Sequence, residues 1–115
     1  MIARRFLHSH GYRFRLQVKK LPGTPDVVLP RLKTVIFVNG CFWHHHPRCS
    51  RSALPQSNRA FWENKIARNV ERDKTTLRLL RRQGWSVITI WDCQLKSAAS
   101  QKKWLSRVLL KLEAK

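Results

Sequence analysis

Acidic residues are scarce in this sequence. Six Asp and Glu stand against 24 Lys and Arg, which gives a formal net charge of +18. A surface this positive predicts a polyanionic partner, but charge alone fits a histone-like or ribosomal-type protein, or binding to an acidic membrane surface, equally well. Any metal-dependent chemistry must draw on the few acids, which are Asp26, Glu63, Glu71, Asp73, Asp92 and Glu113.

Long apolar runs are also missing. The longest lies around residues 35–38, far short of the roughly 18 residues that suggest a membrane span. No signal-peptide pattern opens the chain, so we expect a cytoplasmic protein without a membrane partner. The 115 residues show no repeat or interdomain linker, which predicts one compact domain over residues 1–115.

The periodicity of the apolar residues predicts an α/β fold. Ile2, Phe6 and Leu7 form one face of a short helix, and buried or alternating apolar runs predict strands. The expected strands cover residues 12–18, 26–29, 34–38 and 85–91, with helices near 61–82 and at the C-terminal end. Helices that alternate with strands indicate a mixed sheet with helices on both faces.

Three cysteines are an awkward number for disulfides, and metal binding explains them better. Cys41, His46 and Cys49 lie on one loop, and Cys93 follows a strand that could neighbour the strand leading to Cys41. Four such ligands suit a closed, structural Zn²⁺ site. The alternative is that the cysteines are small buried hydrophobes and the histidines are solvated.

Two acids have a plausible chemical task. Asp26, between a turn and a strand, could bind Mg²⁺. Asp73 follows Trp62, Lys65 and Asn69 at helical spacing and could orient His44 as a catalytic base. Asn69 and Asp73 could equally be boundary residues of a packed helix.

Three segments together resemble the very short patch repair (Vsr) endonucleases. They are FVNGCFWHHH at residues 37–46, FWENKI at 61–66 and NVERD at 69–73. LPGTPD at 21–26 and the segment 84–93 extend the resemblance from about residue 11 to residue 93.

The resemblance implies a fold like that of type II restriction endonucleases and an activity that repairs DNA. Such an enzyme nicks duplex DNA 5′ of the thymine in a T:G mismatch left by deamination of 5-methylcytosine. Asp26 and the carbonyl of residue 38 would hold Mg²⁺, and His44, supported by Asp73, would activate water. Cys41, His46, Cys49 and Cys93 would hold the structural zinc.

The resemblance also implies how the DNA is read. Phe42, Trp43 and Trp62 would wedge into the duplex beside the mismatch, while Lys65 and Asn69 would contact its bases. It further implies a monomer that acts at the nucleoid and works with mismatch repair proteins and a cytosine-5 methyltransferase.

The sequence departs from the family pattern in three places. Val38 and Asn39 stand where family members usually have Thr and His, and the loop before Cys49 is one residue longer. We also expect the chain to lack the family's N-terminal DNA-clasping segment with its acidic residue. These departures leave open a second function, a zinc-stabilised DNA-binding domain without catalysis, and a third, a general polyanion binder.

Overall fold

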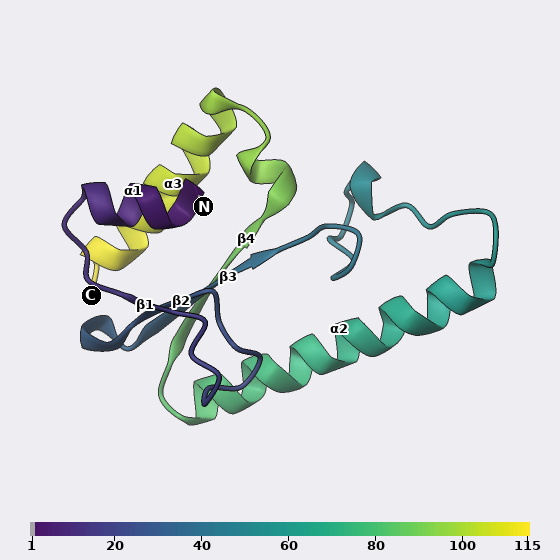
Figure 1. The fold of residues 1–115 in the computed structure, drawn as a ribbon, viewed down its shortest axis with the longest axis horizontal. Helices are drawn as coiled ribbons and strands as arrows, with labels where there is room; N and C mark the ends of the chain where they lie inside the picture. The colour runs from purple at the N-terminus through teal and green to yellow at the C-terminus, as the bar shows by residue number, and fades with distance from the viewer. Residues whose placement is uncertain (1) are drawn as a thin grey trace.

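The computed structural model describes residues 2–115, which form a mixed α/β fold. Four strands lie in one sheet, and the helices flank it (Figure 1). The helices are α1 (Ile2–Ser9), α2 (Arg59–Arg82) and α3 (Ala98–Glu113), and the strands are β1 (Arg15–Leu16), β2 (Val27–Leu29), β3 (Thr34–Asn39) and β4 (Ser86–Trp91). Short 3-10 segments cover Pro30–Leu32, Ser50–Ser52 and Asp92–Leu95.

The sheet has the strand order β1-β2-β3-β4. The first two pairings are antiparallel, and β3 pairs with β4 in parallel. Val35 and Ile36 of β3 are both fully buried, although their side chains point to opposite faces. The continuous apolar run therefore forms a strand covered on both sides, as predicted from the sequence.

Two apolar clusters explain how the helices are placed. On one face, α1 and α3 pack on the sheet through buried residues such as Leu7, Leu105 and Ile36. On the other face, α2 packs through Leu80 against Val28 and Val35. The prediction of helices on both faces is confirmed, and Figure 1 shows α1 and α3 together on the side opposite α2.

The first predicted strand is much shorter than its alternation suggested. Only Arg15 and Leu16 pair with β2, and Leu16 is exposed. Gln17 ends the extended run because its φ of 46° lies in the left-handed region. Tyr12 and Phe14 still pack against the core as partly buried side chains, so the alternation marked a core-facing side of the segment rather than a full strand.

The long helix α2 runs past the end of the sheet, so that its N-terminal half faces the loop after β3 (Figure 1). It ends before Gly84, whose φ of 89° suits a residue without a Cβ. No helix in residues 2–115 combines the length and the apolar character needed to cross a membrane.

Because Leu7 is only 1% exposed, Leu7→Ala should lower the free energy of unfolding by about 2–5 kcal/mol, measured by urea titration. Leu110→Ala is the matched control, since Leu110 is 66% exposed and its loss should cost less than about 0.5 kcal/mol. Equal effects of the two substitutions would show that α1 is not part of the core.

Candidate metal centre and active site

The parallel pairing of β3 with β4 brings two cysteines to one end of the sheet. Asn39 lies opposite Trp91, and Cys41 and Cys93 each follow two residues later. The loop after Cys41 then returns His46 and Cys49 to the same place. The ligand atoms of these four residues lie within 4.8 Å of one another, so the predicted grouping is confirmed.

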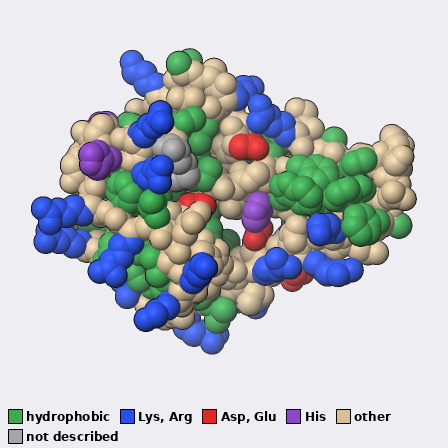
Figure 2. All heavy atoms as spheres, in the orientation of Figure 1, with side chains coloured by type: hydrophobic (Ala, Val, Ile, Leu, Met, Phe, Trp, Pro, Cys, Tyr) green, Lys and Arg blue, Asp and Glu red, His purple; other side chains and the backbone are tan. Residues whose placement is uncertain are grey.

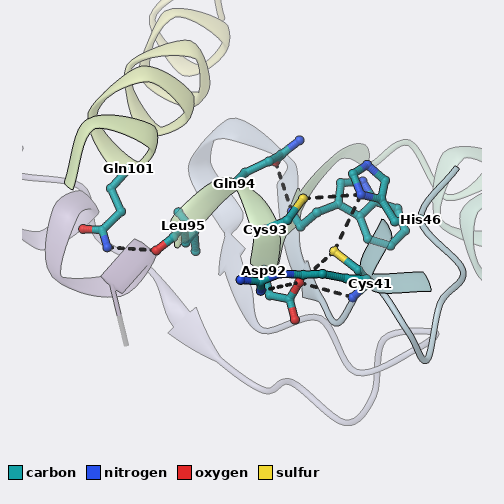
Figure 3. Close-up of polar contacts among 9 residues, drawn as sticks. Cys41, His46, Asp92, Cys93, Gln94, Leu95 and Gln101 are labelled. Atoms are coloured by element: carbon teal, nitrogen blue, oxygen red, sulfur yellow. Dashed lines mark hydrogen bonds and ion pairs between the residues drawn. The ribbon is translucent and has the colours of Figure 1, made fainter. Parts of the chain in front are cut away.

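The spacing of these atoms fits a tetrahedral metal site. Nδ1 of His46 lies 3.6 Å from Sγ of Cys41 and 3.5 Å from Sγ of Cys93 (Figure 3). Zinc bonds of about 2.3 Å to sulfur and about 2.0 Å to nitrogen give a tetrahedral S–N edge of about 3.5 Å. All three cysteines are free thiols, and the cluster could therefore hold a metal ion.

Asp92 lies beside this cluster. Its Oδ1 accepts hydrogen bonds from Sγ and from the backbone N–H of Cys41, at 2.7 Å and 3.4 Å. Burial, and then this bond to Asp92, raises the pKa of the Cys41 thiol to about 12. The same bond is the main cause that lowers the pKa of Asp92. A metal ion at this site must therefore displace the proton of Cys41.

His46 is held in place by two neighbours. Its ring stacks on Trp91, with ring centroids 4.2 Å apart and an interplanar angle of 13°. Oγ of Ser52 lies 3.0 Å from the carbonyl oxygen of His46 and 2.7 Å from that of Cys49, so its one O–H can donate to either. We did not predict these contacts from the sequence, although Trp91 was expected at the end of its strand.

His44 and Asp73 form the second feature of the site. Nδ1 of His44 lies 2.7 Å from Oδ2 of Asp73, and both side chains are about one-third exposed. An ionised carboxylate can only accept, so the proton of this bond sits on Nδ1 of His44. In the neutral imidazole, Nε2 then keeps its lone pair, as a general base requires.

A cavity of about 580 Å³ opens beside this pair, between α2, the loop after β3 and the sheet. Asn39, His44, Asn69 and Asp73 are among the residues that line it. Among the described residues that line this cavity, Asp26 is absent. Its Oδ2 accepts a hydrogen bond of 2.7 Å from the backbone N–H of Val38, one residue before Asn39.

An aromatic cluster covers the neighbouring surface. Phe42 lies edge-on to Trp43 and Trp62 at centroid distances of 5.1 Å and 5.5 Å, and the two tryptophans lie 5.8 Å apart. Phe61, which we did not expect here, lies with its ring centroid 5.1 Å from that of Trp62 and is 58% exposed. Figure 2 shows hydrophobic side chains gathered over this end of the molecule.

Asn69 connects α2 to the loop that carries the aromatic side chains. Its Nδ2 donates a hydrogen bond of 3.0 Å to the carbonyl of Trp43. Lys65, one turn earlier on α2, is exposed. The stripe predicted on α2 therefore faces the loop after β3, through Trp62, Asn69 and Asp73.

The fold and the site together define an α/β protein in which a Cys/His cluster that could hold a metal ion and a His–Asp pair lie beside an exposed aromatic surface. The model of the family described as DNA mismatch endonuclease Vsr matches residues 1–51. The type II nicking enzyme V.NmeAIP of Neisseria meningitidis is 39% identical over 113 residues, which is 98% of this chain and 80% of that protein.

Two further relatives agree. The type II nicking enzyme V.XorIIP of Xanthomonas oryzae is 44% identical over 106 residues, covering 92% of this chain and 77% of that protein. The DNA mismatch endonuclease Vsr of Escherichia coli is 43% identical over 90 residues, 78% of this chain and 57% of that protein. The chain belongs to the Vsr family of DNA mismatch endonucleases.

Asn69→Ala removes the bond to the Trp43 carbonyl and should loosen the loop after β3. We expect faster hydrogen exchange at the amides of residues 43–45 and a loss of about 0.5–1.5 kcal/mol in unfolding free energy. Asn64→Ala, at an exposed position of the same helix, is the matched control and should change neither quantity by as much. Similar exchange rates in both variants would contradict this role of Asn69.

Proposed function

We propose that this protein hydrolyses one strand of duplex DNA on the 5′ side of the thymine in a T:G mismatch, in a Mg²⁺-dependent reaction. The observation that carries the proposal is the His44–Asp73 pair, which opens onto a cavity beside the exposed aromatic cluster. The family membership and the net charge of +18 support DNA as the substrate.

His44 has the geometry of a general base in this reaction. Nδ1 donates to Asp73, so Nε2 can accept a proton from a water molecule as its oxygen attacks the phosphorus atom. One phosphorus–oxygen bond of the DNA backbone then breaks, which leaves a nick. Asp73 is a positioning residue, because it holds the ring in the required tautomer.

Asp26 is the residue that we propose as a ligand for Mg²⁺, together with the backbone carbonyl of Val38. The fit rests on the donor set, since a carboxylate and a carbonyl supply the hard oxygen atoms that Mg²⁺ prefers. Oδ2 of Asp26 is bonded to the N–H of Val38, which leaves Oδ1 outside that bond. When bound, Mg²⁺ would neutralise the negative charge of the phosphate under attack.

We propose that the aromatic cluster recognises the mismatch. Trp43 is 47% exposed and Phe61 is 58% exposed. Exposed aromatic side chains that form a contiguous patch are typical of an interaction site, whereas isolated ones need no explanation. A mispaired step costs less to unstack than a paired one, so Phe42, Trp43 and Trp62 can wedge there. Phe61 extends this surface, and Lys65 and Asn69 on α2 would contact the bases.

We also propose that the cluster of Cys41, His46, Cys49 and Cys93 holds a structural zinc ion. The S–N spacings of 3.5 Å and 3.6 Å support zinc, and four protein ligands leave no open position for catalysis.

We further propose that residues 1–115 form one restriction-endonuclease-like domain that acts as a monomer. Its functional partners would be mismatch repair proteins and a cytosine-5 methyltransferase.

Asp26→Asn keeps the size of the side chain but removes the charge that would hold Mg²⁺. We expect nicking of an end-labelled T:G duplex to fall by about 100-fold or more, while binding of the duplex is retained. Denaturing gels measure the nick, and filter binding measures the complex. Glu71→Gln is the control, since Glu71 lies exposed on α2 and pairs only with Lys74 in the described residues.

The same assay separates the competing functions. Mg²⁺-dependent cleavage of the T:G duplex, with no cleavage of T:A and C:G duplexes or in EDTA, is the expected result. Tight binding of the T:G duplex without cleavage in Mg²⁺ would instead establish a DNA-binding domain. Equal binding of matched and mismatched duplexes would establish a general polyanion binder.

His46→Ala and His45→Ala form a matched pair that tests the zinc site. His46 belongs to the cluster, whereas the neighbouring His45 is exposed and does not. Elemental analysis should find about one zinc per chain in the natural protein and in His45→Ala, and much less in His46→Ala. Equal zinc in both variants, or no zinc in the natural protein, would refute the site.

A further inference from the structure

Strand β4 forms one edge of the sheet. Within residues 2–115 it pairs only with β3, and its other side carries no strand. The backbone N–H of Ser86 donates to the carbonyl of Lys33, at 2.9 Å, on the β3 side. Because the direction of the backbone groups alternates along a strand, those of Val87, Thr89 and Trp91 point away from β3.

One of the three outward N–H groups is already used. The N–H of Trp91 donates to Oε1 of Gln94 at 3.1 Å, and this closes the strand at its C-terminal end. The N–H and C=O groups of Val87 and Thr89 remain on the open edge. An open edge of this kind is a template for pairing with another extended chain.

A groove of about 330 Å³ runs along this edge, between β4 and α3. Ile88 and Ile90 of β4 line it but are nearly buried, at 5% and 2% exposed. Trp104 of α3 lines the opposite wall, and Leu110, which is 66% exposed, lies on the same helix. The groove therefore offers backbone donors and acceptors beside a surface that apolar side chains can cover.

The charged residues of the groove are all basic. Arg107 and Lys111 line it, and no lining residue among those described is acidic. The Arg107 guanidinium lies 4.6 Å from the ring centroid of Trp104. A second copy of this chain, with its own charge of +18, is a poor occupant of this groove.

We propose that this groove binds an extended acidic segment of a partner protein, which adds a strand to β4. Its backbone would pair with Val87 and Thr89, its alternate apolar side chains would pack on Trp104, and its carboxylates would face Arg107 and Lys111. The DNA backbone fits less well, because it carries no alternating N–H and C=O groups that could pair with a strand edge. This inference does not depend on the proposed nicking reaction.

The test uses the whole protein and a short fluorescent peptide in which valine and glutamate alternate. We expect saturable binding by fluorescence polarisation at physiological salt, weakened by about tenfold or more in Arg107→Glu/Lys111→Glu. Arg4→Glu/Arg5→Glu makes the same charge change at exposed positions of α1 and should keep the affinity within about threefold. Equal weakening of peptide binding by the two double variants would show that binding depends on the overall charge of the protein and not on the groove. That result would overturn the proposal.

Hydrogen exchange detects backbone pairing at β4, which charge attraction alone would not produce. Bound peptide should slow exchange at the amides of Val87 and Thr89 by about tenfold or more, because each becomes paired. Unchanged exchange at both amides in saturating peptide would overturn the added strand. Protection of the same amides by a matched DNA duplex, but not by the peptide, would show that the groove belongs to the DNA surface instead.

Discussion

The parallel pairing of β3 with β4 is the interaction on which the functional site depends. Its register sets Asn39 beside Trp91, so that Cys41 and Cys93 leave the sheet at the same end. The loop from Cys41 onward contains no strand or α-helix before α2 begins at Arg59. The four ligands Cys41, His46, Cys49 and Cys93, within 4.8 Å of one another, are what can fix its shape.

With its ends fixed, this loop can direct successive side chains to different tasks. Trp43 joins the exposed aromatic cluster, His44 turns to Asp73, and His46 turns to the cysteines. The long helix α2 supplies the opposing groups, because it runs past the sheet and faces the loop. The site is therefore a loop set against a helix, and it places the residues that we propose for recognition beside those that we propose for catalysis.

The sequence alone predicted those parts of the fold and of the site that depend on a local pattern or on residue type. Apolar runs predicted the buried strands and α2, and the resemblance predicted the approach of His44 to Asp73, which the structure confirms. The contacts that were missed depend on tertiary approach. The left-handed backbone at Gln17 follows from no propensity, and the stacking of Trp91 on His46 requires the sheet register first.

We propose that the ligand cluster organises a catalytic site that is separate from it. The most direct measurement is the rate of T:G nicking as tightly bound zinc is removed and returned, with Mg²⁺ in excess throughout. We expect the rate to fall by more than about tenfold on removal, because His44 loses its fixed position, and to recover with one equivalent of zinc. Full nicking by zinc-free protein would show that the ligand cluster does not organise the catalytic site.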